Sequence, residues 1–249
     1  MDDGSLKCWG WNGNGQLGLG DKIGRGNKPD QMGDNLPAAK LGHERRAVSI
    51  VAGYAHVCAH LDDQSVKCWG IGNLGQLGHG DKNGRGDHAN EMGYYLPAVD
   101  LGTGRHAVSI WSGLTHSTCA ILDDGSLKCW GWNGNGQLGL GDKIGRGNKP
   151  DQMGDNLPAA KLGHERRAVS IVAGYAHVCA HLDDQSVKCW GIGNLGQLGH
   201  GDKNGRGDHA NEMGYYLPAV DLGTGRHAVS IWSGLTHSTC AILDDGSLK

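Results

Sequence analysis

The sequence predicts an all-β fold built from β-propeller blades, each with four antiparallel strands. Glycine accounts for 45 of the 249 residues, which favours frequent tight turns and disfavours helix interiors. Apolar residues make up only 38% of the chain, so we expect a thin and divided core. Related segments of about 60 residues fill the chain, and repeats of that length are typical of propellers, solenoids and arrays.

The repeats follow a simple order. Residues 2–122 recur unchanged as 123–243, and residues 244–249 begin a further copy. Each long copy has two related halves, so the sequence units are 2–61, 62–122, 123–182 and 183–243. We therefore expect one repeat array over residues 1–249 with about four blades, three whole and one split between the termini. Recent duplication, engineering and misassembly of repetitive DNA would each account for the identical copies.

Four short runs near the start of the array have the composition of β-strands and are separated by turn residues. They are Ala38–Leu41, Val48–Ala52, His56–Leu61 and Val66–Trp69. Four short strands of this kind make one propeller blade. The polar, glycine-rich segment Gly80–Leu96 is expected to form a long loop between blades.

The fullest copy of the repeat, His116–Asp142, carries the residues of a known motif. It contains in order His-x-x-Cys-Ala, Leu-Asp-Asp-Gly, Leu-Lys-Cys-Trp-Gly and Gly-Gln-Leu-Gly-x-Gly-Asp. This combination resembles the regulator of chromosome condensation repeat family. Within that family it is most similar to the microbial members that have long loops and cysteines. The resemblance covers essentially the whole chain and implies blades of four antiparallel strands. Ultraviolet-sensing relatives have a Gly-Trp-Arg-His-Thr motif that Ile110-Trp111-Ser112-Gly113 does not match, so photoreception is not implied.

A tight turn between two predicted strands places cysteines opposite one another. If Asp123-Asp124-Gly125 is a three-residue hairpin loop with the glycine in the left-handed conformation, Cys119 faces Cys129. A two-residue turn would place Cys119 opposite Trp130 instead. The first register predicts disulfides, whereas buried free thiols are the alternative. The predicted pairs are Cys58–Cys68, Cys119–Cys129 and Cys179–Cys189, with Cys8–Cys240 added if the ring closes.

Charge and hydropathy restrict the partners and the cellular location. A net charge of −3 gives no basic field for nucleic acid, and no apolar run approaches the length that spans a membrane. We therefore expect neither a nucleic-acid nor a membrane partner. Disulfides would indicate the extracellular space or another oxidising compartment, yet Met1–Ser5 lacks the apolar segment of a signal peptide.

Histidines and tryptophans recur at fixed places in the repeat. The histidines start the strand that carries the first cysteine, and we expect each to make a structural hydrogen bond; they are His56, His116, His177 and His237. The tryptophans of the Cys-Trp-Gly segment are expected to pack between blades; they are Trp69, Trp130 and Trp190. No serine or cysteine stands beside these histidines in a nucleophile–base pattern, so we predict no catalytic residue.

Three segments look like functional sites but fit turns better. Gly13–Gly18 matches a dinucleotide fingerprint, yet the residues after it cannot form the helix that such a site needs. Asp81–Asp87 begins like a calcium loop, but Arg85 and Met92 stand where oxygen ligands are required. Asp62-Asp63 lies at a hairpin tip, where solvated carboxylates are poor acid–base catalysts. We predict no cofactor and no metal.

Three functions are compatible with these features, and none is enzymatic catalysis of a reaction by active-site side chains. The leading hypothesis is a non-catalytic scaffold whose propeller loops bind an unidentified protein partner. The second is a self-assembling structural propeller, engineered or recently duplicated, in which a homodimer closes a ring. The third, guanine-nucleotide exchange, is implied by the family resemblance alone.

Overall fold

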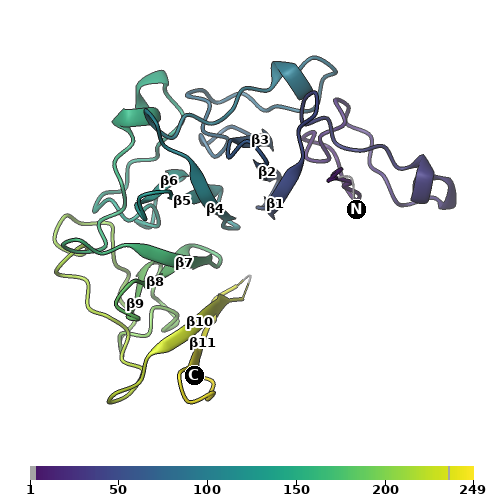
Figure 1. Ribbon diagram of the computed structural model, residues 1–249. Helices are drawn as coiled ribbons and strands as arrows, with labels where there is room; N and C mark the ends of the chain where they lie inside the picture. Colours follow the sequence, from purple (N-terminus) through teal and green to yellow (C-terminus); the bar gives the residue numbers. More distant parts are fainter. Residues whose placement is uncertain (1–3, 235) are drawn as a thin grey trace.

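The computed structural model describes residues 4–234 and 236–249, whose strands form four antiparallel sheets (Figure 1). The first three sheets are β1–β3 (Ala47–Ala52, His56–Leu61, Val66–Gly70), β4–β6 (Ala107–Ser112, Ser117–Leu122, Leu127–Gly131) and β7–β9 (Ala168–Ala173, His177–Leu182, Val187–Gly191). The fourth sheet is β10–β11 (Ala228–Ser233, Thr239–Leu243). The long loops contain 3₁₀ turns: η1 (Pro29–Gln31), η2 (Gly33–Asn35), η3 (Gly93–Tyr95), η4 (Pro150–Gln152) and η5 (Gly154–Asn156).

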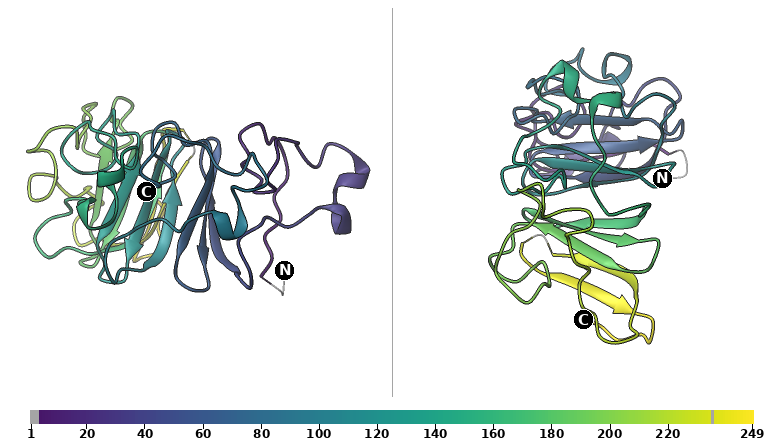
Figure 2. Two further views of the ribbon diagram at one scale, coloured as in Figure 1. Left: turned by 90° about the horizontal axis from the view of Figure 1, so that it is seen from above. Right: turned by 90° about the vertical axis from the view of Figure 1, so that its left-hand side faces the viewer.

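The sheets stand side by side as the blades of an open arc (Figure 1). Strands β1, β4, β7 and β10 line the concave side, and each contacts the inner strand of the neighbouring blade. The long loops and their 3₁₀ turns lie on the outer rim, and the chain termini lie at opposite ends of the arc. Two side views show the same succession of sheets (Figure 2). The prediction of an all-β fold made of propeller blades is confirmed.

Each whole sheet has three strands where the sequence predicted four. The segment Ala38–Leu41 is extended, but a single backbone hydrogen bond, from Ala39 N to Leu6 O (2.7 Å), joins it to the blade before. The preceding Pro37 has no N–H with which to extend the pairing. Equivalent single bonds link Val99 to Val66, Ala160 to Leu127 and Val220 to Val187. The fourth element is therefore an extended outer edge of the blade rather than a regular strand.

Each blade combines residues from two neighbouring sequence units. In the first whole blade, β1 and β2 come from unit 2–61 and β3 comes from unit 62–122. Strands β10 and β11 form the first part of a fourth blade, whose third strand corresponds in sequence to residues 6–10 at the other end of the arc. Gly10 pairs with Arg25 as Gly131 pairs with Arg146, so the end of this segment keeps the bridge that follows a third strand.

The core is divided among the gaps between blades. All side chains of β2, β5 and β8 are buried, because neighbouring blades cover both faces of each middle strand. In one gap, Cys119 and Ile121 of β5 pack in a cluster with Ile171 of β7 and Val178 of β8. Within the described residues, no helix has the length and apolar character needed to cross a membrane.

Candidate functional site

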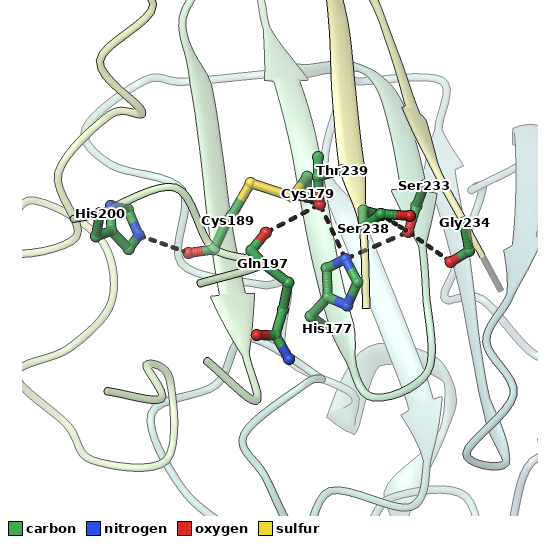
Figure 3. The surroundings of a disulfide bond; sticks show 9 residues. All are labelled: His177, Cys179, Cys189, Gln197, His200, Ser233, Gly234, Ser238 and Thr239. Atoms are coloured by element: carbon green, nitrogen blue, oxygen red, sulfur yellow. Dashed lines mark hydrogen bonds between the residues drawn. A yellow bond between two sulfur atoms is a disulfide. The ribbon is translucent and has the colours of Figure 1, made fainter. Parts of the chain in front are cut away.

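A cross-strand disulfide closes the hairpin of each whole blade; the bonded pairs are Cys58–Cys68, Cys119–Cys129 and Cys179–Cys189. Figure 3 shows the third pair between β8 and β9. The pairing register depends on a three-residue hairpin loop whose last residue is left-handed. The φ angle of this last residue is 78° at Gly125 and 67° at Gln64. A left-handed conformation costs a glutamine a modest amount of free energy that glycine does not lose.

Cys8 and Cys240 are not bonded to each other. The sequence predicted this pair only for a closed ring, and here the arc is open and its ends lie apart (Figure 1). Cys240 is exposed, whereas Cys119, the same residue one copy earlier, is buried. Burial raises the pKa of the half-buried Cys8 thiol, which favours its protonated form.

The recurrent tryptophans join each blade to a loop of the blade before it. Trp69, Trp130 and Trp190 have 0% of their surface exposed. Their indole N–H groups donate at 3.0 Å to the backbone oxygens of Gln16, Gln76 and Gln137, respectively. These glutamines belong to the Gly-Gln-Leu-Gly loops. The contact requires glycine at the end of the loop, since a Cβ on Gly78 would lie 2.9 Å from the Trp130 indole nitrogen.

Two of the recurrent histidines are buried at the start of a middle strand. His56 Nε2 lies 3.0 Å from Thr118 Oγ1 and 2.9 Å from Ser112 Oγ, both in the next blade. Thr118 donates its hydroxyl hydrogen to Gln76 O, so His56 Nε2–H is the donor to Thr118. Burial, with a smaller contribution from neighbouring His116, lowers the pKa of His56 to about 3.

His177 makes the same bridge one copy later. Its Nε2 atom lies 3.0 Å from Thr239 Oγ1 and 3.2 Å from Ser233 Oγ (Figure 3). Burial, with a smaller contribution from His237, lowers the pKa of His177 to about 4. Both histidines therefore tie neighbouring blades together in their neutral form.

The other two histidines lie outside the strands, contrary to the sequence-based expectation. His116 precedes β5 with a φ of 58°, and His237 precedes β11. These halves have one more residue between histidine and cysteine, so Ser117 rather than His116 takes the place that His56 has in the register. The His116 Nδ1 atom lies 3.2 Å from Gln76 Nε2, and its ring packs against Tyr54 with centroids 5.1 Å apart.

The glycine-rich loop after each third strand is closed by its own side chains. Asn12 Oδ1 accepts a hydrogen bond from Leu17 N (2.8 Å), and Asn12 Nδ2 donates to Asp21 O (2.8 Å). A Cβ on Gly15 would lie 2.3 Å from Asp87 N, so this loop also packs against the next one. The dinucleotide-like motif is thus a structural turn. Asn133 makes the same bonds in the second long copy.

The loop around Asp81–Asp87 is held by ion pairs. Arg85 Nη2 lies 2.7 Å from Asp81 Oδ2, and Lys22 Nζ of the preceding loop lies 2.7 Å from Asp87 Oδ2. Asp87, His88 and Glu91 could bring ligand atoms within 4.8 Å of one another. The Lys22 ammonium group is already paired with Asp87, and Glu91 Oε2 accepts hydrogen bonds from the backbone N–H groups of Gly86, Asp87 and His88 (3.0–3.2 Å), so the arrangement supports a loop-to-loop contact rather than a cation site.

Paired tyrosines form the most exposed aromatic groups on the loops. Tyr94 and Tyr95 have 91% and 69% of their surface exposed, and their rings meet edge to face with centroids 5.9 Å apart. Tyr215 and Tyr216 repeat this arrangement. The corresponding residues of the other two units are Asp34-Asn35 and Asp155-Asn156. This alternation of aromatic and polar residues at one loop position is the signal that could have identified the tyrosines.

A shallow hollow adjoins each tyrosine pair. The first has a volume of about 410 Å³ and is lined in part by Tyr94, Lys40, His43 and Arg45. The second has a volume of about 470 Å³ and is lined in part by the equivalent residues Tyr215, Lys161, His164 and Arg166. The lysine and histidine of each hollow are exposed. The arginine of each hollow is paired with two aspartates of a hairpin tip, and the histidine lies within 3.9 Å of a glutamate, so the lysine is the basic group that each tyrosine tip has beside it.

Comparison with known proteins identifies related sequences. Two family models described as "Regulator of chromosome condensation (RCC1) repeat" match the chain, one over residues 3–60 and 124–181 and the other over 47–76, 108–137 and 168–197. The ultraviolet-B receptor UVR8 of Arabidopsis thaliana is 30% identical over 201 residues, which are 81% of this chain and 40% of UVR8. The human E3 ubiquitin-protein ligase HERC2 is 29% identical over 204 residues, 81% of this chain but 4% of HERC2. The chain thus spans less than half the length of these relatives.

Solved structures share the fold. Yeast RCC1 (Prp20) in its complex with Kap60 superposes with a TM-score of 0.68 at 19% identity, covering 98% of this chain and 51% of that one. A structure of Prp20p from Saccharomyces cerevisiae, described with its binding to Gsp1p and histones, gives a TM-score of 0.67 at 18% identity and covers 98% and 52%. This chain therefore has the architecture of about half of those propellers.

Proposed function

The chain belongs to the regulator of chromosome condensation repeat family, and we propose that it acts as a non-catalytic scaffold that binds another protein through its rim loops. The observation that carries this proposal is the pair of equivalent tyrosine tips, Tyr94-Tyr95 and Tyr215-Tyr216. Clusters of exposed tyrosine are typical of interface hot spots, because the ring buries a large apolar area at a low cost in conformational entropy.

The groups around each tip define the chemistry of the partner. Lys40 is exposed beside Tyr94, and Lys161 is exposed beside Tyr215. A partner segment that carries carboxylates next to apolar or aromatic side chains would complement both features. Because the two tips are identical, a partner with two such segments would bind more tightly than a partner with one.

A catalytic role has no support from the titratable groups. Ser112 Oγ lies 2.9 Å from His56 Nε2, as in a hydrolase pair, but the histidine is buried and its Nδ1 atom has no hydrogen-bond partner within the described structure. The carboxylate that would orient such a histidine is therefore missing. At the hairpin tip, Asp123 and Asp124 lie within 3.4 Å of Arg105, which suits a surface ion pair.

Two other functions remain from the sequence. Guanine-nucleotide exchange rests on the family resemblance, and the binding of Prp20p to Gsp1p and histones is a property of that protein. Self-assembly concerns the ends of the arc rather than its rim, and it is compatible with a binding role for the loops.

The scaffold proposal is tested by selecting a displayed library of linear peptides on the immobilised chain. Acidic peptides with apolar residues are expected to be enriched. A variant with Tyr94→Ala, Tyr95→Ala, Tyr215→Ala and Tyr216→Ala should bind the selected peptides at least about tenfold more weakly, since each tip loses two hot-spot side chains and each loss costs more than about 1 kcal/mol. Isothermal calorimetry with synthetic peptides measures the change.

The matched control replaces the polar residues at the same loop position of another unit, Asp34→Ala with Asn35→Ala, and should leave peptide affinity unchanged. Correct folding of all variants is checked by mass spectrometry of the non-reduced protein, which should show that the three intramolecular disulfides have formed. If the enriched peptides bind the four-alanine variant as tightly as the wild type, the tyrosine tips are not the binding site and the proposal is wrong.

A further inference from the structure

Asparagine is followed by glycine at six positions, which form three structurally distinct kinds. Each kind occurs twice: the first is Asn12 with Asn133, the second is Asn14 with Asn135, and the third is Asn83 with Asn204. Such an asparagine can lose its side-chain amide when the glycine nitrogen attacks the side-chain carbonyl carbon, since glycine has no Cβ to obstruct the approach. The attack requires a side chain that is free to turn toward the backbone and a glycine N–H that can lose its proton.

In the first kind, the side chain is held on both sides of its amide. Asn133 has 0% of its surface exposed. Its Oδ1 atom accepts a hydrogen bond from Leu138 N (2.9 Å), and its Nδ2 atom donates to Asp142 O (2.8 Å). Asn12 makes the same two bonds. The amide group therefore cannot turn toward its own backbone unless the loop first opens.

In the second kind, the glycine N–H is the group that is held. Gly136 donates its N–H to Asn133 O, and Gly15 donates its N–H to Asn12 O, each at 3.0 Å. A hydrogen bond that an N–H donates stabilises its protonated form, so the nitrogen is a poorer nucleophile. The backbone is also packed closely here, since a Cβ on Gly136 would lie 2.3 Å from Gly207 C. This kind is protected at the attacking atom.

The third kind satisfies both requirements. Asn83 and Asn204 are exposed. Within the described part of the chain, the N–H groups of Gly84 and Gly205 donate no hydrogen bond. Neither asparagine has the backbone bonds that hold the side chains of the first kind. The Asn204 amide donates a hydrogen bond to the carboxylate of Asp202, two residues earlier in the same loop, and this bond does not cover the side-chain carbonyl carbon.

We propose that Asn83 and Asn204 are sites of self-modification, at which the chain converts its own asparagine to aspartate or isoaspartate. Gly84 N gives its proton to hydroxide and attacks Asn83 Cγ, and the amide nitrogen takes up a proton and leaves as ammonia. The product is a five-membered cyclic imide. Water then opens the imide: cleavage at the side-chain carbonyl gives aspartate, and cleavage at the main-chain carbonyl gives isoaspartate. The reaction consumes one water, releases one ammonia and transfers no electrons.

The modification is confined to two of the four units and changes both charge and backbone. The other two units carry Ile23 and Ile144 at this position, so only the units with the tyrosine pairs react. Each reaction replaces a neutral amide by a carboxylate, and reaction at both sites takes the net charge from −3 to −5. Isoaspartate also lengthens the main chain by one carbon just before Arg85, whose N–H and C=O groups pair with Gly70 at 3.0 and 2.7 Å.

The experiment incubates the folded protein, with its disulfides intact, near neutral pH. Mass spectrometry of chymotryptic peptides follows each kind, and the two members of a kind are averaged because their peptides are identical in sequence. The third kind should react at least about tenfold faster than the first and second, which react only after local opening. Its rate should rise with pH, since hydroxide removes the glycine proton. Protein isoaspartate methyltransferase with labelled S-adenosylmethionine measures the isoaspartate formed, and isoelectric focusing measures the added charge.

Two controls separate the structure from the dipeptide sequence. A variant with Asn83→Ile and Asn204→Ile has the residue that the other two units carry, and it should keep its charge throughout the incubation. In guanidinium chloride with the disulfides reduced, all three kinds should react at similar rates. The proposal is overturned if the first or second kind reacts as fast as the third in the folded protein, or if the variant gains charge at the wild-type rate. It is also overturned if the third kind stays intact in the folded protein but reacts in the unfolded chain.

Discussion

Replacing one tryptophan at two equivalent positions tests the blade-to-blade packing directly. Trp130 and Trp9 have the same neighbours in sequence, yet the first is 0% exposed and the second is 62% exposed. A fully buried tryptophan removes about 150–250 Å² from water, which corresponds to about 4–6 kcal/mol as an upper estimate. We expect Trp130→Ala to lower the free energy of unfolding by about 4 kcal/mol. Trp9→Ala should lower it by about 1–2 kcal/mol, in proportion to the smaller buried fraction.

The hydrogen bond of the indole contributes little to this difference. Gln76 O accepts from the Trp130 indole at 3.0 Å and also from the Thr118 hydroxyl at 2.9 Å, so it keeps one donor after the substitution. Trp130→Phe should therefore cost only about 1 kcal/mol for the lost bond, in addition to a smaller loss of packing. Urea unfolding followed by far-ultraviolet circular dichroism, with the disulfides oxidised and the protein dilute enough to be monomeric, measures all three values. Equal losses for Trp130→Ala and Trp9→Ala would refute the assignment of Trp130 to a blade junction.

Three more predictions concern stability. The pKa of His56 is lowered to about 3 in the folded state, so its contribution is complete above the unfolded pKa near 6.5 and falls with decreasing pH. We expect about 2 kcal/mol to be lost between pH 7 and pH 5, and urea titrations should show a shallower pH dependence for His56→Gln. Gln64→Gly, at a φ of 67°, should stabilise the chain by about 1 kcal/mol in thermal unfolding, whereas Gly125→Ala should destabilise it because its Cβ would lie 2.8 Å from a neighbouring Cβ. Replacing Cys119 and Cys129 together by serine should lower the free energy of unfolding by about 3 kcal/mol. An unchanged value would contradict a stabilising role of the disulfide in this short hairpin.

Much of the blade could be predicted from the sequence because its strands are short and bounded by turns. The three-residue loop at Asp123-Asp124-Gly125 determines which residues face each other, so Cys119 and Cys129 are opposite one another in the structure as in the prediction. The prediction of a fourth strand was wrong for a local reason. The segment Ala38–Leu41 follows a proline and makes only one backbone hydrogen bond to the neighbouring strand segment.

Other features of the site depend on three-dimensional context that spacing does not encode. One additional residue in His116-Ser117-Thr118-Cys119 moves His116 out of the strand, and only the backbone register reveals this. The carbonyl oxygen that accepts the hydrogen bond from the Trp130 indole belongs to Gln76, which lies in a loop 54 positions earlier in the sequence. Closure of the ring could not be inferred from the repeat alone, because the curvature of the arc follows from how neighbouring blades pack.

The division of the core among the gaps has a consequence for how the molecule comes apart. Each middle strand packs against the two blades beside it, so stability passes from blade to blade as in a one-dimensional chain of coupled units. A terminal blade has one such coupling and an internal blade has two. Opening therefore begins at the ends and moves inward, and the amide hydrogens of β5 and β8 should outlast those of β11 in hydrogen exchange. Every added copy of the repeat lengthens the protected interior without altering the two ends.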